Sequence, residues 1–206
     1  MYKQERMYGF IQEFMEPRIQ RSLNQLKNGL NQKSGQMSHE LLSCTDRLFK
    51  KCIFQQRKGI KQPIRYIHFF YLNLSVLTGK YDIQVNAFSE QSYMDKTESM
   101  ELWNPEFFME LYEKDMEEME KEAKKQIPQF GYSQMIDLKR SIFGIYTKMI
   151  GQYLLMTAED IAEIPSFCEM KKAEGIQMIY GGYMDICFQL WPIPKLEETA
   201  WQEEKR

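Results

Sequence analysis

The chain has 206 residues, of which 43% are hydrophobic, 27% are charged and 14% are aromatic, with a formal net charge of -2 at pH 7. This composition excludes a disordered chain, and the length suffices to bury a core without disulfides or metal ions. No uncharged apolar run approaches the roughly 20 residues that cross a bilayer, so we expect no transmembrane helix and no membrane partner.

We expect a single globular domain over residues 1–196 and a polar tail over residues 197–206. Residues 1–15 mix charged and apolar side chains, unlike the basic and then apolar blocks of a secretory signal. The chain is therefore expected in the cytoplasm, where cysteines remain reduced. The sequence holds four cysteines but no C-x-x-C pair, so we expect no metal site and no cofactor.

Two helices are predicted in the first third of the chain. The first helix is expected over residues 3–28, with apolar residues at helical spacing after Pro17, which should bend the helix or start a new one. Gly29 should end it. A loop is expected over residues 31–37. Ser38 is then a suitable N-cap for a second helix, which a glycine and a proline near residue 60 should end.

A β-hairpin is predicted over residues 64–88, because the apolar period changes there from helical to alternating. Gly79-Lys80 stands where a two-residue loop with glycine first would fall. With that loop Val76 opposes Ile83, and one face of the hairpin is apolar while the other is mostly polar. Such a hairpin would cover a core with its apolar face.

Two longer helices and two short ones should follow. The Asn-Pro-Glu sequence at residues 104–106 combines a cap, a proline at the first helical position and a carboxylate near the positive helix end. It predicts a third helix, which runs to about residue 126. A fourth helix is predicted over residues 133–156, and its wide apolar arc indicates a central position. Two short capped helices are expected between residues 157 and 175.

In the last apolar segment, residues 176–190, every even-numbered position holds an apolar side chain or a glycine: Ile176, Met178, Tyr180, Gly182, Met184, Ile186, Phe188 and Leu190. A single long strand with a glycine-softened bend places all of them on one face. The alternative is a hairpin that turns at Gly181-Gly182, but this register mixes Gln177 with Ile186. We therefore favour the long strand.

Together these elements predict a helix-rich α+β fold. About five or six helices should pack on one face of a small antiparallel sheet, which combines the long hairpin 64–88 with the C-terminal strand 176–190. The order of the strands does not follow from the sequence.

Candidate chemistry is sparse. The chain lacks the G-x-S-x-G, G-x-x-x-x-G-K-[ST], G-x-G-x-x-G and H-E-x-x-H motifs, so no catalytic residue is predicted. Of the two histidines, His39 should face water, whereas His68 falls on the apolar face of the predicted hairpin. A buried imidazole could act as base or ligand, although a hydrogen-bonded structural histidine is the commoner case. The residues predicted to line a ligand pocket are His68, Tyr66, Tyr180 and Tyr183.

Charge is distributed unevenly along the chain. Residues 18–65 hold eleven basic and two acidic side chains, whereas residues 90–122 hold twelve acidic and three basic ones. The basic segment could bind nucleic-acid phosphates or an acidic partner, or could face the acidic helix within the fold. The candidate residues are Arg47, Lys50, Lys51, Arg57, Lys58, Lys61 and Arg65.

Three function classes follow. The favoured one is a non-catalytic interaction protein, such as an accessory, adaptor, inhibitor or immunity-like subunit, that binds another protein or a second copy of itself by surface complementarity. The first alternative is a nucleic-acid-associated accessory protein that binds phosphates through residues 47–65. The second is a small-ligand binder or an enzyme with a pocket near His68.

Overall fold

The computed structural model describes residues 2–192. They form six α-helices: α1 (Tyr2–Phe10), α2 (Glu16–Arg57), α3 (Ser75–Thr78), α4 (Glu106–Gln126), α5 (Tyr132–Ala162) and α6 (Pro165–Glu169). They also form five strands: β1 (Ile64–Tyr71), β2 (Ile83–Phe88), β3 (Met100–Trp103), β4 (Lys172–Gly182) and β5 (Cys187–Trp191). A π-helical segment (Ile11–Met15) joins α1 to α2, and a single 3₁₀ turn (Ser92–Met94) lies between β2 and β3. The predicted helix-rich α+β class is confirmed, whereas the tail predicted over residues 197–206 lies outside the described residues.

The strands form one sheet in the order β3-β2-β1-β4-β5. Three neighbouring pairs are antiparallel, but β1 and β4 are parallel, so the expectation of an antiparallel sheet is wrong for the central pair. A parallel pair needs a long crossover connection. Here the chain between β1 and β4 includes α4 and α5, which return it to the end of the sheet where β1 begins.

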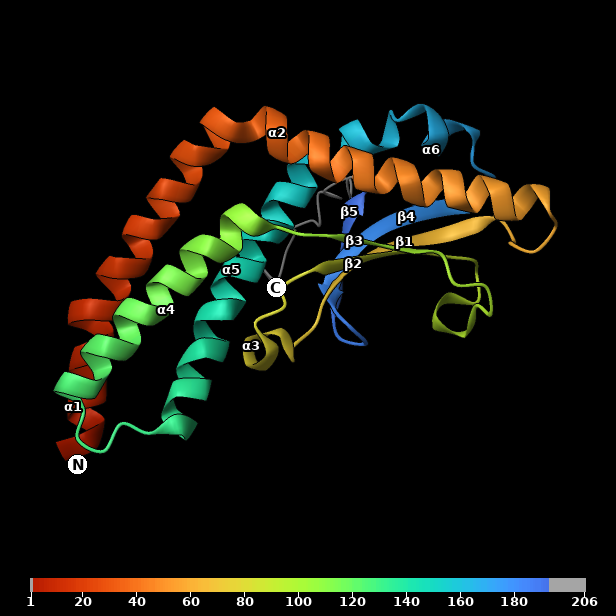
Figure 1. The fold of residues 1–206 in the computed structure, drawn as a ribbon. Coiled ribbons are helices and arrows are strands. Elements are labelled where there is room, and N and C mark those ends of the chain that lie inside the picture. The colour runs from red at the N-terminus through yellow and green to blue at the C-terminus, as the bar shows by residue number, and fades with distance from the viewer. Residues whose placement is uncertain (1, 193–206) are drawn as a thin grey trace, which may run out of the picture.

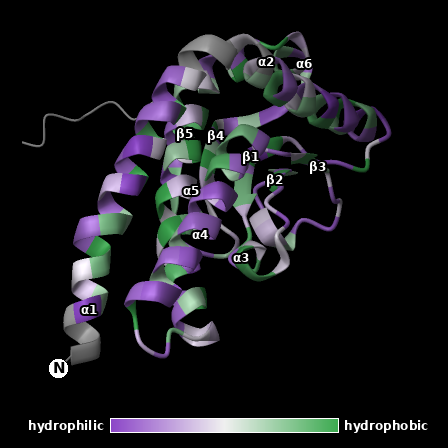
Figure 2. Ribbon diagram, turned by 60° about the vertical axis from the view of Figure 1, so that its left-hand side comes forward, coloured by the Kyte–Doolittle hydropathy of each residue, from purple (hydrophilic) through white to green (hydrophobic). Residues whose placement is uncertain are grey.

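The helices divide into a part that covers the sheet and a part that extends beyond it (Figure 1). The second half of α2 runs across one face of the sheet with α6 beside it, while its first half forms a bundle with α4 and α5. Figure 2 shows these helices banded along their length by hydrophobic and hydrophilic residues, as expected of helices that cover a core with one side. None of the helices within residues 2–192 combines the length and apolarity needed to span a membrane.

Two predicted helix boundaries are wrong. Helix α2 continues through the loop expected over residues 31–37 and changes direction instead of ending (Figure 1). Gly29 serves close packing, because a Cβ at this position would overlap the ring of Phe107 on α4. Helix α5 likewise continues past residue 156, since the Thr157 hydroxyl donates to the carbonyl of Tyr153 inside the helix and does not cap a new one.

The hairpin predicted over residues 64–88 exists as the antiparallel pair β1 and β2, but its register and loop are wrong. Ile67 lies opposite Ala87, and residues 72–82 connect the strands through α3. Gly79 has a φ of 67° and ends α3. A glycine in this left-handed conformation is common both in hairpin loops and at helix C-termini, so its presence alone does not distinguish the two.

The single strand predicted over residues 176–190 is also wrong, because β4 and β5 form a hairpin around residues 183–186. Tyr180 lies opposite Phe188 on the same face of the sheet. An odd number of residues separates Tyr180 from Phe188, so even-numbered residues lie opposite even-numbered ones and share one face. The alternation of apolar side chains is therefore the same for one long strand and for this hairpin.

Candidate functional site: the outer face of the sheet

The two faces of the sheet differ in what covers them. Ile67, Phe69, Val85 and Ala87 are fully buried on the face packed against α2 and α5. We call the opposite side the outer face, and Figure 1 shows residues 89–99 lying on this side of the sheet, away from α2. Alternation along the paired strands gives the outer face its central residues: Tyr66, His68 and Phe70 of β1 and Gln84, Asn86 and Phe88 of β2.

Five aromatic rings gather around His68 on the outer face, and we call these six residues the aromatic cluster: Tyr66, His68, Phe70, Phe88, Tyr93 and Tyr183. The His68 ring lies edge-on to four of them, with centroid separations from 4.9 to 5.8 Å. Tyr93 comes from the segment over residues 89–99 and Tyr183 from the turn between β4 and β5. Segments far apart in the sequence therefore meet over the middle of the sheet.

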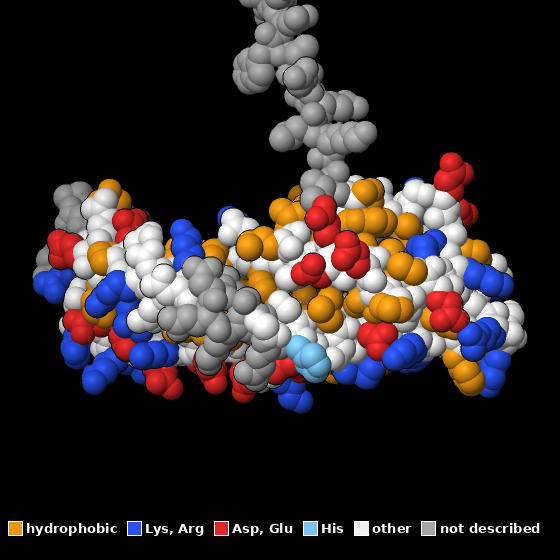
Figure 3. Space-filling model, turned by 90° about the horizontal axis from the view of Figure 1, so that it is seen from above, with side chains coloured by type: hydrophobic (Ala, Val, Ile, Leu, Met, Phe, Trp, Pro, Cys, Tyr) orange, Lys and Arg blue, Asp and Glu red, His pale blue; other side chains and the backbone are white. Residues whose placement is uncertain are grey.

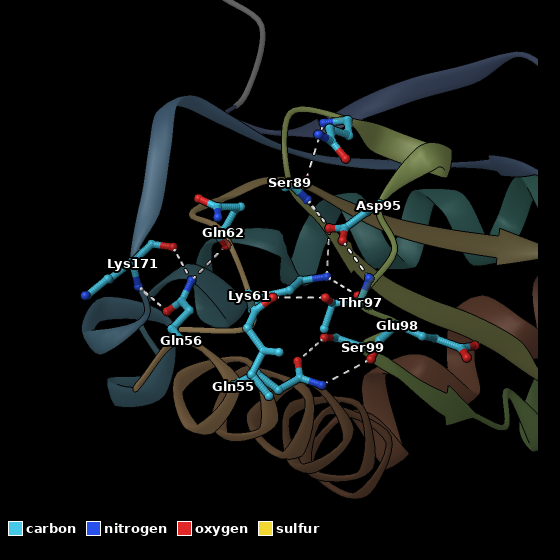
Figure 4. Close-up of polar contacts among 12 residues, drawn as sticks. Gln55, Gln56, Lys61, Gln62, Ser89, Asp95, Thr97, Glu98, Ser99 and Lys171 are labelled. Atoms are coloured by element: carbon cyan, nitrogen blue, oxygen red, sulfur yellow. Dashed lines mark hydrogen bonds and ion pairs between the residues drawn. The ribbon is translucent and has the colours of Figure 1, made fainter. Parts of the chain in front are cut away.

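A buried ion pair holds the segment that carries Tyr93 (Figure 4). Lys61 Nζ donates to Asp95 Oδ2 at 2.9 Å and to the carbonyl of Thr97 at 2.5 Å. The same carboxylate accepts the backbone N–H groups of Ser89 and Thr97. The Lys61 side chain is fully buried, and that of Asp95 is 8% exposed. Burial alone would raise the pKa of Asp95, but these hydrogen bonds outweigh it and hold the pKa below its usual value.

We call the Lys61–Asp95 ion pair and its hydrogen bonds to Ser89 and Thr97 the clamp. Two glutamines at the end of α2 make further hydrogen bonds beside it (Figure 4). Gln55 donates to the carbonyl of Glu98 and accepts from the Ser99 hydroxyl. Gln56 donates to the carbonyls of Gln62 and Lys171 and accepts the Lys171 N–H. The last turns of α2 thus position both residues 89–99 and the start of β4.

His68 is the most unusual polar residue of the outer face. Its side chain is 3% exposed, and neither ring nitrogen has a hydrogen-bond partner within residues 2–192. Burial lowers the pKa of His68 from 6.5 to about 4, so the imidazole is neutral near pH 7. A buried polar group without a partner costs about 1–3 kcal/mol, and such an exception to normal satisfaction needs an explanation.

Asn86 is the second unpartnered polar residue. It lies directly opposite His68 in the β1–β2 register, is 7% exposed, and its Oδ1 has no hydrogen-bond partner among the residues the structure covers. His68 and Asn86 are therefore neighbours on the outer face, and each has buried polar atoms without a hydrogen-bond partner. Within residues 2–192, the buried side-chain nitrogen and oxygen atoms without a hydrogen-bond partner all belong to this pair.

A cavity of about 540 Å³ opens beside this pair. Its lining residues are Leu72, Gln84, Asn86, Phe88, Tyr93, Asp95, Lys96, Glu98 and Tyr183. Phe88 and Tyr93 both line the cavity and pack on His68, so these two rings separate the imidazole from the open space. The volume falls within the range of roughly 300–1,000 Å³ that is usual for small-molecule sites.

The structure brings three of the four predicted pocket residues together. Tyr66, His68 and Tyr183 belong to the aromatic cluster. Tyr180 lies on the other face, where its hydroxyl donates to the carbonyl of Thr147 at 2.8 Å. His68 was expected on the hairpin face that covers the core, but the shift in register places it on the outer face.

Sequence reasoning missed Asn86 and Tyr93. The predicted hairpin places Asn86 on its mostly polar face, because Asn86 alternates with apolar neighbours, and alternation gives no indication that this position is buried. Tyr93 lies in a segment without periodicity, and Ser92 beside it has a φ of 51°. An aromatic residue in such a loop was the signal available, but it indicates no particular neighbour.

The seven predicted phosphate-binding residues have contacts within the fold. Arg47, Lys50 and Arg57 form ion pairs with Glu101, Asp46 and Glu169. Lys51 donates to the carbonyl of Met100, Arg65 to that of Glu174, and the Lys58 ammonium lies over the Phe54 ring. Lys61 is buried in the clamp. These contacts engage much of the positive charge that the basic segment carries, and Figure 3 shows acidic and basic side chains interspersed over the side of the molecule that is seen from above.

Comparison with known proteins gives no further guidance, because no family model, no curated protein and no solved structure matches this chain. Within residues 2–192, no three His, Cys, Asp or Glu side chains are grouped so that they could hold a metal ion. The candidate site therefore depends on its own geometry.

Acid should destabilise the protein through His68. Between pH 6.5 and about 4 the unfolded chain binds a proton at this residue and the folded chain does not, so stability falls as the pH is lowered. The slope approaches about 1.4 kcal/mol per pH unit. We expect His68→Phe to reduce this slope and to stabilise the protein at pH 7, as measured by urea denaturation across pH 4.5–7.

The control is His39→Gln, since His39 is exposed. This variant should keep the slope of the wild-type protein. An unchanged slope in His68→Phe would show that the imidazole is protonated in the folded protein and is not buried as the structure has it.

Proposed function

We propose that this protein works by binding rather than by catalysis, and that the outer face of the sheet is its recognition surface. The observation that carries the proposal is the cavity lined by Asn86, a buried polar side chain whose Oδ1 has no partner within residues 2–192. Proteins normally satisfy such groups, and a bound partner that supplies hydrogen bonds would remove the penalty. In this proposal the protein is a non-catalytic interaction protein, and it binds its partner through the outer face.

The surroundings of His68 favour binding over acid–base catalysis. A general base requires a pKa near the working pH and access to the proton that it takes. The pKa of His68 is about 4, and its ring contacts are with Tyr66, Phe70, Phe88 and Tyr93. Among the residues that the structure describes, no carboxylate orients the imidazole as in catalytic pairs. The geometry of His68 therefore gives no support to acid–base chemistry at this residue.

Phosphate binding through residues 47–65 is less well supported as an alternative. Its cations are engaged by carboxylates, by carbonyl groups and by an aromatic ring of the same chain. Phosphate contacts would have to compete with these interactions. The expectations of a cytoplasmic location and of a partner protein or a second copy remain part of the proposal.

Tyr183→Ala should weaken capture of the natural partner. Tyr183 is 45% exposed and contributes an aromatic wall of the cavity, and aromatic residues contribute strongly to recognition surfaces. The test uses immobilised protein and an extract of the host cells, with retained proteins and small molecules identified by mass spectrometry. We expect one retained species to fall by roughly ten-fold or more with this variant.

The matched control is Tyr132→Ala, because Tyr132 is 78% exposed in the first turn of α5 and lies outside the cavity. It should retain the same species as the wild-type protein. The proposal is wrong if every retained species binds Tyr183→Ala as well as it binds Tyr132→Ala.

A further inference from the structure

Two carboxamides form the polar floor of the cavity. Asn86 and Gln84 lie two residues apart on β2, both side chains are on the outer face, and both line the open space. A carboxamide presents a hydrogen-bond acceptor and donor side by side. The Oδ1 atom of Asn86 is buried and unpartnered among residues 2–192, so this acceptor is already desolvated before any ligand arrives.

The charges around the floor are balanced. Asp95 is held by Lys61, and the remaining charged lining residues, Lys96 and Glu98, are exposed and of opposite sign. An ionised ligand would lose its hydration without gaining an opposite charge at the floor. The cavity therefore favours a ligand whose buried part is uncharged.

The walls are aromatic rings. Tyr93 is 37% exposed and Tyr183 is 45% exposed, and both line the cavity. The Tyr93 ring stacks on Phe70 with an interplanar angle of 22° and lies edge-on to Tyr183. These fixed ring surfaces are suited to stacking against another flat ring.

From this arrangement we propose that the cavity binds an uncharged planar nitrogen heterocycle, the chemical class of the purine and pyrimidine bases. This inference depends on the proposed role of the outer face as a recognition surface. The edge of the heterocycle pairs with the Asn86 carboxamide, in the way that asparagine and glutamine pair with adjacent donor and acceptor atoms of a base. Its face stacks on Tyr93 or Tyr183. The heterocycle is either a free base or nucleoside, or a base of a single-stranded nucleic acid.

The test is titration of the full chain with adenosine, guanosine, cytidine and uridine, with ribose as the probe that lacks the heterocycle. Binding is measured by calorimetry and by the side-chain amide resonances of Asn86. At least one nucleoside should bind and shift these resonances, and ribose should not. Asn86→Leu should weaken that binding about ten-fold or more, because the carboxamide is lost.

Asn73→Leu is the matched control, since Asn73 is exposed and lies outside this cavity. Its affinity should equal that of the wild-type protein, and both variants are first checked for folding by circular dichroism. A short single-stranded oligonucleotide distinguishes the two sources. Salt-sensitive binding tighter than that of the nucleoside identifies nucleic acid, whereas equal or weaker binding identifies the free heterocycle, and either result supports the shared chemistry.

The inference is overturned if no nucleoside binds at millimolar concentration, or if Asn86→Leu binds as tightly as Asn73→Leu. Capture that still depends on Tyr183 would then leave the outer face as a recognition surface for another class of ligand. If nucleosides do not bind and capture does not depend on Tyr183, the proposed function is wrong as well. The failure of the ligand class and the failure of the recognition surface are thus distinguished.

Discussion

Replacing Lys61 by methionine is expected to lower the free energy of unfolding by about 3–5 kcal/mol, the range found when one partner of a buried ion pair is removed. Methionine keeps most of the volume of the lysine side chain but leaves the Asp95 carboxylate in a nearly closed site with only two backbone donors. Urea denaturation at pH 7 measures the loss.

Two variants separate the charge effect from a packing effect. The double variant Lys61→Met with Asp95→Asn removes both charges and keeps one of the two oxygens that accept the backbone N–H groups of Ser89 and Thr97, so it should recover part of the lost stability. Lys58→Met removes an exposed lysine nearby and should change stability by less than about 0.5 kcal/mol. Equal losses for Lys61→Met and Lys58→Met would contradict the buried clamp.

The pH dependence of the clamp has a defined sign. The pKa of Asp95 in the folded protein is below the ordinary value of 3.8, so its contribution to stability is complete above that pH. The contribution is lost as the pH falls from 3.8 through the pKa of the folded state. The effect of Asp95 therefore begins below the range in which His68 acts, and the two residues can be studied separately.

Replacing Asp115 by leucine is expected to cost a similar amount, about 3–5 kcal/mol. Asp115 is fully buried and accepts hydrogen bonds from Arg18, Ser22 and Tyr146 at 2.7 to 2.8 Å. It thereby joins α2, α4 and α5 in the helical bundle. Its loss leaves two hydroxyl groups without their acceptor, and leaves the mostly buried Arg18 guanidinium with the partly exposed Glu118 as its remaining carboxylate partner within residues 2–192.

A graded variant and a surface variant complete the test, again by urea denaturation. Burial and the Asp115 carboxylate raise the pKa of Tyr146, so its hydroxyl stays protonated and donates. Tyr146→Phe removes this single bond and should cost about 1–2 kcal/mol. Asp137→Leu replaces an exposed carboxylate on α5 and should change stability by less than about 0.5 kcal/mol. A loss in Asp115→Leu no larger than that in Tyr146→Phe would contradict the network.

The helices were largely predictable because their signals are local. The Asn-Pro-Glu start at residues 104–106 and the apolar stripe that follows predict α4 almost to its boundaries. Helix α5 was found by the same reasoning, although it extends to Ala162. Errors arose at Gly29 and Thr157, where residues that often end or begin helices have other roles. Gly29 admits the ring of Phe107, and Thr157 bonds back to its own helix.

The candidate site was predictable only in part. His68 and Tyr66 share a face in any register of β1, because alternate residues of a strand point to the same side. Whether that face packs against the helices or against residues 89–99 depends on how β1 pairs with β2. A different length of the loop between the strands would place these side chains on the opposite face. Asn86 and Tyr93 enter the site through that pairing and through the clamp at Lys61.

The sequence by itself determined the helix-rich α+β class, the existence of most helices and the parity of side chains along the strands predicted within residues 64–88 and 176–190, whereas it gave no indication of β3. These properties depend on residues within a few positions of one another, through helical period, capping and alternation. Only the tertiary structure decided the parallel pairing of β1 with β4, the turn within residues 176–190 and the assignment of the outer face. Those features depend on contacts between segments far apart in the chain, and the local pattern is the same for either outcome.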